Sequence, residues 1–333
     1  MIWKRRLPIV PASFFGMVLG LVGLGGAWRA AMAAWGLPAF IGEAITVVGV
    51  FVWAALVLLT LAKWMQARQA ALAEVNHPVQ GGFVALVGVT TSLVSLAVLP
   101  YGRPAALLLF TAGALTTVAF AVWRMGDIWR RDDEVPVTPV LYLPTVGGGF
   151  VTATAAAAFD FRELGYLAFG FGLFSWLAIE SLVLRVLLAR PGLPVAMRPT
   201  LGIQLAPPAV GGVAALSLFG EAAAPFVLTM VGYALFQVLL ALRLLGWFRA
   251  QPFVPGYWSF SFGATALGSL GIHLAKVNTG ALSAALAPIL FVAANLAVAA
   301  LVIATVRLAA EGRLLQSASG PIPRAATPSA VRV

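Results

Sequence analysis

Ten apolar runs of bilayer length constrain this chain more than any other feature of its sequence. A helix of about 20 residues spans the hydrocarbon core of a membrane. With 61% hydrophobic and only 10% charged residues, the chain has too much apolar side chain for a water-soluble core. We therefore predict an all-α membrane protein with ten transmembrane helices. The predicted spans lie near residues 10–29, 39–62, 78–98, 104–124, 138–158, 164–188, 199–219, 223–245, 252–274 and 281–307.

The Lys and Arg residues fall mostly on one side of the predicted membrane. When the spans alternate in direction, 17 of the 21 lie on the side of both termini, and only Arg29, Arg103, Arg162 and Lys276 lie on the other. Cytoplasmic loops carry such an excess of positive charge. This predicts a multi-pass protein of the bacterial inner (plasma) membrane with both termini in the cytoplasm. The net charge of +10 then reflects topology, and we expect no nucleic-acid partner.

Residues 10–308 form the predicted transmembrane domain, and residues 1–9 are its cytoplasmic N-terminus. Lys4, Arg5 and Arg6 precede an apolar run, as in a signal peptide, but the run is long enough to span and fits the repeat described next. Residues 309–333 are rich in Ser, Pro, Ala and Arg, which predicts a disordered cytoplasmic tail.

Prolines open the odd-numbered spans at a nearly constant interval. They are Pro11, Pro78, Pro139, Pro199 and Pro255, separated by 67, 61, 60 and 56 residues. A near-constant period is typical of a repeated supersecondary unit. We therefore predict five helical hairpins.

The two helices of each hairpin differ in composition. The odd spans hold 18 Gly and 9 Pro, and the even spans hold 7 Gly and 3 Pro. Proline frees backbone carbonyls, which in a membrane must face protein or water. This favours odd helices inside, around a central pore, and even helices outside against lipid. Close helix packing is the alternative, and it accounts for Gly23, Gly25 and Gly26.

Charged residues within the spans are few. Glu43, Arg243 and the Arg124–Asp127 pair lie on even helices, where structural pairing or subunit contact is the favoured interpretation. Glu180, deep in the sixth span, is a candidate proton carrier. The chain has no Cys, two distant His residues and no acid–base pair or phosphate-binding loop, so we expect no catalytic residue, metal or cofactor.

The predicted path contains small, hydroxyl and aromatic residues and almost no charge. Weak binding suits conduction, and the basic cytoplasmic surface favours anions. A dicarboxylate carrier would keep a basic residue in the path, and the odd spans offer none between their ends. We expect the path to be lined by Phe15, Gly16, Gly20, Thr90, Thr91, Gly148, Phe150, Pro207 and Gly263.

Several of these residues stand in familiar motifs, and the chain resembles the tellurite-resistance/dicarboxylate transporter (TehA-type) family, the bacterial relatives of plant slow anion channels. The resemblance covers roughly residues 8–308. It is carried by PASFFGMVLGLVGLGGAW (11–28), ALVGVTTSLV (85–94), LYLPTVGGGF (141–150), LGYLAFGFGLFSW (164–176), LGIQLAPPAV (201–210), LRLLGW (242–247) and YWSFSFG (257–263).

The resemblance implies five hairpins around a quasi-fivefold pore and a homotrimer with one pore per subunit. It implies that Phe262 occludes the pore, that Gly16 lies close to its ring, and that Glu180 matches an acidic residue of the sixth helix. Ser181 follows Glu180 where relatives can have proline, which leaves the local helix geometry open.

The substrate stays open between two kinds of transport. A channel gated by Phe262 would pass small inorganic anions of the chloride or nitrate kind, or tellurite. The alternative is a proton-coupled exporter of tellurite or C4-dicarboxylate, with Glu180 carrying the proton. A membrane enzyme or quinone-binding subunit is a third class that the residues support least.

Overall fold

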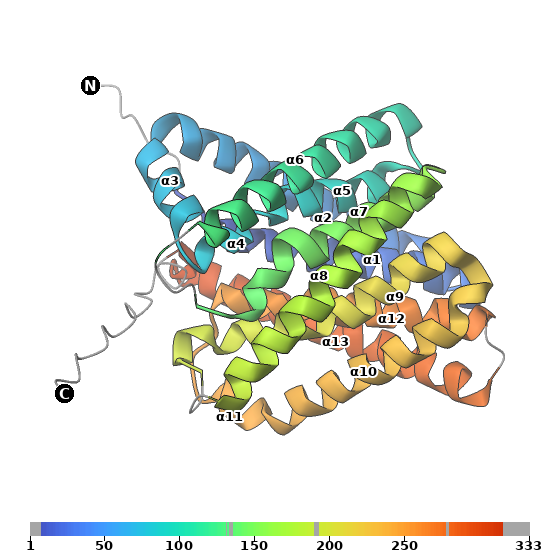
Figure 1. Cartoon of the computed structure of the whole chain (residues 1–333). Coiled ribbons are helices and arrows are strands. Elements are labelled where there is room, and N and C mark those ends of the chain that lie inside the picture. Colours follow the sequence, from blue (N-terminus) through green and yellow to red (C-terminus); the bar gives the residue numbers. More distant parts are fainter. Residues whose placement is uncertain (1–7, 131, 133–135, 190–192, 278–279, 316–333) are drawn as a thin grey trace.

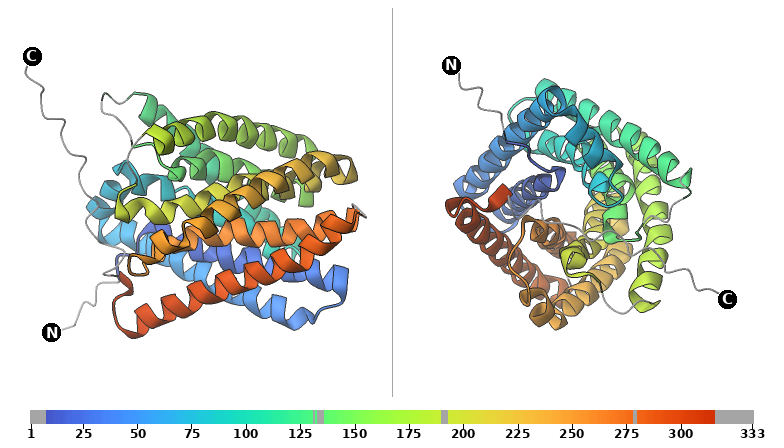
Figure 2. Two further views of the ribbon diagram at one scale, coloured as in Figure 1. Left: turned by 90° about the horizontal axis from the view of Figure 1, so that it is seen from below. Right: turned by 90° about the vertical axis from the view of Figure 1, so that its left-hand side faces the viewer.

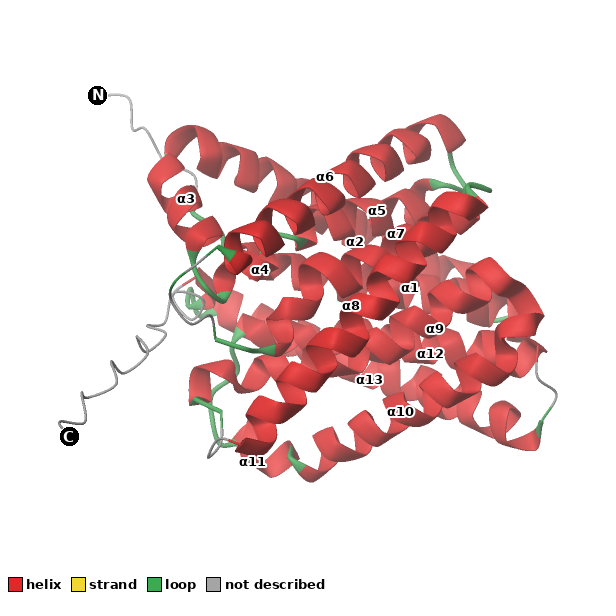
Figure 3. Ribbon diagram, in the orientation of Figure 1, coloured by secondary structure: helices red, strands yellow, loops and turns green. Residues whose placement is uncertain are grey.

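The computed structural model describes residues 8–130, 132, 136–189, 193–277 and 280–315. In these ranges the chain is helical, without any strand, and its long helices cross one another at shallow angles along a common axis (Figures 1 and 3). The prediction of an all-α chain is confirmed for this part. The predicted N-terminal segment up to residue 7 and the tail from residue 316 lie outside the described residues.

In the part of the chain that the structure describes, ten long helices follow one another as five successive pairs and overlap the predicted spans. The pairs are α1 (Phe15–Trp35) with α2 (Ala39–Gln66), α5 (Leu86–Val98) with α6 (Arg103–Trp129), α7 (Gly148–Ala158) with α8 (Arg162–Ala189), α9 (Ala206–Phe219) with α10 (Ala224–Arg243), and α12 (Ser259–Val277) with α13 (Ala281–Ala310). Short connectors complete the chain: α3 (Arg68–Asn76), η5 (Gly220–Ala223) and α11 (Leu245–Arg249).

An irregular turn precedes the first helix of every pair. Proline opens or interrupts most of these turns, because it lacks the N–H of a regular helical hydrogen bond. Four of them are 3-10 turns, one is a single α-turn, and one is a π-helix. They are η1 (Ala12–Phe14), α4 (Gln80–Phe83), η2 (Pro139–Leu141) with the π-helix η3 (Leu143–Gly147), η4 (Val195–Leu205) and η6 (Pro255–Trp258).

The described chain begins and ends at the same end of the bundle. The Trp258 Nε1 group donates to Thr305 Oγ1 near the end of α13 at 2.8 Å, and η6 also contacts η1. We call this the terminal end. The first helix of each pair therefore runs from the terminal end to the opposite end, and the second helix returns.

By length and composition, eight stretches of helix in the described residues can cross a membrane. One of them, Val195–Arg243, contains both α9 and α10. Helix α12 is not among the eight, because its glycines, serines, His273 and Lys276 make it less apolar. The eight stretches contain nine of the ten long helices of the described residues, so the prediction of ten transmembrane helices is confirmed in part.

The first helices of the pairs are more deeply buried than the second. In the most apolar window of each stretch, 50%, 67% and 78% of residues are buried in Ala12–Trp35, Gln80–Val98 and Pro139–Ala158. The values are 17%, 28%, 39% and 28% for the stretches that contain α2, α6, α8 and α13. Viewed along the axis, outer helices enclose inner ones (Figure 2, right). The inner helices contact one another in the order α1, α5, α7, α9, α12 and back to α1.

Two buried cations hold the terminal end together. Lys63 donates to the Val10 carbonyl at 2.8 Å and pairs with Glu74, whose other oxygen accepts the Ala12 N–H at 2.7 Å. Arg124 lies 3.8 Å from Asp127, which confirms the predicted pair, and donates to the carbonyls of residues 75, 77 and 78. The contacts of Arg124 attach the loop before α4 to α6.

Candidate functional site

Two cavities lie within the inner layer and meet at Phe262. The wide cavity, of about 410 Å³, is lined by residues of α1, α5, α7, α9 and α12, with Thr46 from α2. The narrow cavity, of about 20 Å³, is lined by earlier residues of the same five helices and by η3 and η4. The wide cavity therefore lies toward the opposite end of the bundle and the narrow one toward the terminal end.

Phe262 and Val210 line both cavities. The Phe262 side chain is 8% exposed and Val210 is 5% exposed. On α1, a Cβ built on Gly23 would stand 3.6 Å from Phe262 Cδ2. The phenylalanine ring thus separates a cavity wide enough for hydrated ions from one with room for about one water molecule.

Arg29 is the charged residue of the wide cavity. Its Nε and Nη2 groups donate to the two Glu43 carboxylate oxygens at 2.8 Å, and Nη1 donates to the Ala97 carbonyl at 3.1 Å. Tyr101 donates its hydroxyl to Glu43, and this hydrogen bond raises the pKa of the Tyr101 phenol above its ordinary value. The predicted structural pairing of Glu43 is confirmed, with Arg29 as its partner.

His273 and Ser269 also line the wide cavity, from α12. The His273 Nδ1 atom lies 2.8 Å from the Ser269 carbonyl oxygen. Because a carbonyl only accepts, Nδ1 carries a proton and donates it to this oxygen.

Arg29 and His273 line the wide cavity, whereas we expected no basic residue between the ends of the odd spans. The first span was predicted to end at residue 29, which placed Arg29 at the non-cytoplasmic boundary of that span. Helix α1 continues to Trp35 and ends at Gly36, whose φ of 68° suits glycine. The signal available in the sequence was the helical period of 3.6 residues, which places Arg29 and His273 on the same helix faces as other residues of the cavity wall. Val22, Gly26, Arg29 and Ala33 share one face of α1, and Phe262, Ala266, Ser269 and His273 share one face of α12.

Three of the ten residues expected along the path line a cavity. Phe262 lines both, and Phe150 and Pro207 line the narrow one. Gly23 and Gly26, expected to serve packing, line the wide cavity. The 3.6-residue helical period would have separated the residues that line a cavity from those that pack between helices. A helix in a ring turns one face to the axis and its other faces to its neighbours.

The four expected glycines lie at contacts between helices. A Cβ on Gly16 would stand 3.3 Å from Trp258 Cβ, and one on Gly20 would stand 2.5 Å from Ser261 Oγ. A Cβ on Gly148 would contact Thr117 of α6, and one on Gly263 would stand 2.8 Å from Leu205 Cβ. None of the four lines either cavity.

Phe15, Thr90 and Thr91 also lie away from the two cavities. Phe15 is 1% exposed in the apolar core. Thr90 donates to the Leu86 carbonyl at 2.7 Å. Thr91 donates to the Val87 carbonyl at 2.7 Å and accepts the Trp53 indole N–H of α2 at 3.1 Å. Both hydroxyls therefore bond to their own helix, and that of Thr91 also joins α5 to α2.

Glu180 accepts three hydrogen bonds between α8, α10 and the start of η3. The donors are Tyr142 at 2.5 Å, Trp176 at 3.0 Å and Tyr233. Tyr142 also lines the narrow cavity, whereas Glu180 does not. The carboxylate thus lies one side chain away from the axis.

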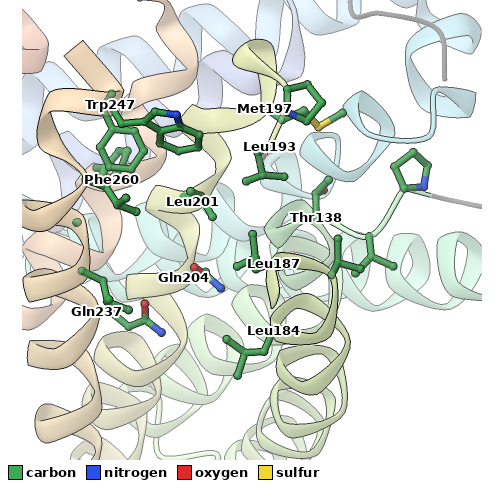
Figure 4. Close-up of a pocket in the computed structure, with 18 of the residues that line it drawn as sticks. Thr138, Leu184, Leu187, Leu193, Met197, Leu201, Gln204, Gln237, Trp247 and Phe260 are labelled. Atoms are coloured by element: carbon green, nitrogen blue, oxygen red, sulfur yellow. The ribbon is translucent and has the colours of Figure 1, made fainter. Parts of the chain in front are cut away.

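A further cavity, of about 670 Å³, lies between α8, α10 and η4 (Figure 4). It is lined by residues of α8, η4, α10 and α11, by residues 136–138 and by Phe260 of α12, and no residue of α1, α5, α7 or α9 contributes. Gln204 and Gln237 are the polar amides on its wall, which is otherwise mostly apolar. This crevice is therefore separate from the two cavities that meet at Phe262. Among the described residues, no cluster of three His, Asp or Glu could hold a metal ion.

Comparison with known proteins identifies the kind of bundle. The sequence profile described as voltage-dependent anion channel matches residues 10–306. The tellurite resistance protein TehA homolog of Haemophilus influenzae is 29% identical over 260 residues, which cover 78% of this chain and 79% of that protein. An uncharacterized transporter of Methanocaldococcus jannaschii is 23% identical over 226 residues, which cover 60% of this chain and 65% of that protein.

Proposed function

Because this chain belongs to the voltage-dependent anion channel family, we propose that it conducts small anions along an axis that Phe262 closes. The position of Phe262 carries the proposal, since its ring separates a cavity of about 410 Å³ from one of about 20 Å³. Anions of the chloride or nitrate class are the proposed substrates. Tellurite is a further candidate because it appears in the name of the bacterial relative.

The walls of the two cavities support conduction without tight binding. The narrow cavity is lined by apolar side chains and Tyr142, and no charged residue contributes to it. The wide cavity contains one ion-paired arginine and no carboxylate. The narrow cavity is an apolar constriction, and the wide cavity next to it is weakly cationic. This combination suits an anion that must enter and leave quickly.

The proposed channel consists of five hairpins around a quasi-fivefold axis, with the first helix of each pair inside. The ring of contacts from α1 through α12, and the greater burial of these helices, support the arrangement. In this proposal Phe150 and Pro207 line the narrow part, while Gly16, Gly20, Gly148 and Gly263 allow the inner helices to approach their neighbours.

We propose the inner membrane as the location, with the terminal end in the cytoplasm. The 17-to-4 division of Lys and Arg supports this orientation. Residues 10–308 would form the membrane domain, and the segment from 309 a cytoplasmic tail whose beginning still belongs to α13. The exposed apolar faces of α2, α6 and α13 would contact lipid or neighbouring subunits, and a homotrimer is the assembly that the family resemblance implies.

Replacing Phe262 tests the proposal. Phe262→Ala joins the two cavities, so its anion conductance in liposomes or oocytes should exceed that of the parent by at least about tenfold, as expected where one side chain occludes a pore. Phe260→Ala is the matched control, because this ring lies two residues earlier, stacks on Tyr257 and meets Phe248 edge to face, and lines neither of the two cavities. A Phe262→Ala variant that conducts no more than the parent would reject the gate.

A proton-coupled exporter of tellurite or dicarboxylate is the second candidate, and the hydrogen bond from Tyr142 to Glu180 favours it. Tyr142 lines the narrow cavity, so a proton on Glu180 would lie beside the path. Uptake of labelled anion under an imposed pH gradient decides between the two. In a coupled carrier, anion uptake depends on the pH gradient, and Glu180→Gln removes that dependence. In a channel, anion uptake does not depend on the pH gradient in either protein. Family membership supports either form of transport over the membrane enzyme or quinone-binding subunit.

A further inference from the structure

We propose that Arg29 is the anion-binding residue of the wide cavity, where it holds a small monovalent anion before the anion reaches Phe262. The proposal rests on the function proposed above and adds a specific site to it. Among the described residues, Arg29 is the one Lys, Arg, Asp or Glu that lines either cavity. Its charge acts between apolar walls, where a Coulomb attraction is stronger than in bulk water.

The guanidinium is held by protein contacts and keeps a donor to spare. Three of its five N–H groups donate to Glu43 and Ala97. Tyr101 also interacts with the guanidinium, which leaves at least one N–H group for an anion, and the Arg29 side chain is 22% exposed. Because the Glu43 carboxylate and the Ala97 carbonyl fix the head group, an anion would meet a preorganised donor.

Apart from Arg29, the polar side chains on the wall of the wide cavity are those of Thr46, Thr154, Ser269 and His273. His273 of α12 uses its Nδ1–H on the Ser269 carbonyl, so this N–H group is not available to an anion. The Thr46 and Thr154 hydroxyls donate to the carbonyls of their own helices, at 2.8 and 2.9 Å. Arg29 is therefore the strongest donor of the cavity.

The charge of the site selects the class of anion. Glu43 offsets part of the Arg29 charge, so an anion is attracted weakly and released easily, as conduction requires. A dicarboxylate needs a cation for each carboxylate, and the cavity has one. The site therefore suits halide- or nitrate-like ions better than C4-dicarboxylates.

Substitutions on the two sides of the ion pair separate an anion site from a structural brace. In the Phe262→Ala background, Arg29→Gln should lower the chloride-to-cation permeability ratio by about 3- to 10-fold, the effect of removing one nearby charge. Glu43→Gln should raise chloride conductance, because it exposes the full arginine charge. Arg103→Gln is the control, since Arg103 is 61% exposed and lines neither cavity. Reversal potentials in a chloride gradient give the ratio.

If Arg29→Gln and Glu43→Gln changed permeation in the same direction, the proposal would be overturned. A purely structural ion pair is lost whichever of its two partners is replaced. The Arg29→Gln/Glu43→Gln double variant guards against misfolding from an unpaired charge, and it should keep the low permeability ratio of Arg29→Gln. A parent-like ratio in the double variant would also reject the site.

A binding measurement distinguishes failure of this site from failure of the channel. Bromide should raise the melting temperature of the otherwise unmodified protein, and Arg29→Gln should abolish that shift. If Phe262→Ala conducts nothing but the bromide shift depends on Arg29, the channel proposal fails and the site stands. If Phe262→Ala conducts and the shift is absent or survives Arg29→Gln, the site fails alone.

Discussion

Gly23 of α1 lies against the Phe262 ring, where a Cβ would stand 3.6 Å from Phe262 Cδ2 and in closer contact with Thr265. One turn further, Gly26 lines the same cavity and has no atom within 4 Å of its Cβ direction. The two glycines share a helix face but differ in what they touch. Only Gly23 has a packing reason to lack a side chain.

Alanine at these two positions should therefore have different effects on stability. Gly26→Ala gains up to about 1 kcal/mol of helix propensity and meets open space, so the melting temperature should rise. Gly23→Ala gains the same propensity but must displace Thr265, which is fully buried, so the gain should be offset or reversed. Thermal unfolding in one detergent compares the two directly. Equal stabilisation by both alanines would contradict the packing of Gly23 against α12.

The spans could be predicted because the length of an apolar run can be counted directly along the sequence and compared with the thickness of a bilayer. Apolar runs and prolines located all ten long helices and the irregular turns before the inner ones. The direction in which a residue faces is a property of neighbouring helices. Gly16 and Gly20 pack on Trp258 and Ser261, whereas Gly26 faces the cavity, and residue type alone does not distinguish them.

Arg29 was missed for a related reason. A cation that follows a long apolar run is usually a loop residue, and the positive-inside rule treats it as one. Here Glu43 of α2 pairs with Arg29, and α1 continues past the charge to Trp35. The partner lies 14 residues further along, beyond the loop that joins α1 to α2, and composition alone does not reveal the pair.

A carboxylate at Gly16 tests whether this residue acts through packing. Its Cβ would stand 3.3 Å from Trp258 Cβ, so Gly16→Asp and Gly16→Asn should both destabilise the protein, by about 1–3 kcal/mol from overpacking. Melting temperature and the monodisperse fraction on size exclusion report the effect. A carboxylate that acted by repelling anions in the path would instead make Asp suppress flux and leave the Asn variant conducting.

Glu74 should be a strong stability determinant at the terminal end. Its carboxylate binds Lys63, whose side chain is 3% exposed, and the Ala12 N–H. Glu74→Gln leaves a buried ammonium without its counter-charge, which costs about 3 kcal/mol or more. The melting temperature should fall, and Lys63→Met combined with Glu74→Gln should recover part of the loss. As a control, Glu311→Gln removes half of a pair in which both side chains are more than half exposed, and it should change little. A Glu74→Gln variant as stable as the parent would show that this ion pair does not hold the start of α1.

Acid should loosen the turn before α4 through His77. The His77 Nδ1 atom accepts the N–H groups of Val79 and Gln80 at 3.1 and 3.0 Å, which requires the neutral ring. Burial, and then the positive charge of Arg124, lower the pKa of His77 below its ordinary value of 6.5. The unfolded chain therefore takes up this proton at a higher pH than the folded protein does.

It follows that the stability contributed by neutral His77 is complete above about pH 6.5 and is lost as the pH falls below that value toward the folded pKa. The melting temperature of the parent should be lower at pH 5.5 than at pH 7.5. His77→Asn keeps a side-chain acceptor that stays uncharged, so its melting temperature should change less over the same interval. Arg124 also donates to the carbonyls of residues 75, 77 and 78. Its contribution to stability stays constant over this pH interval, because arginine remains protonated. An acid-induced loss of equal size in both proteins would place the titrating group elsewhere.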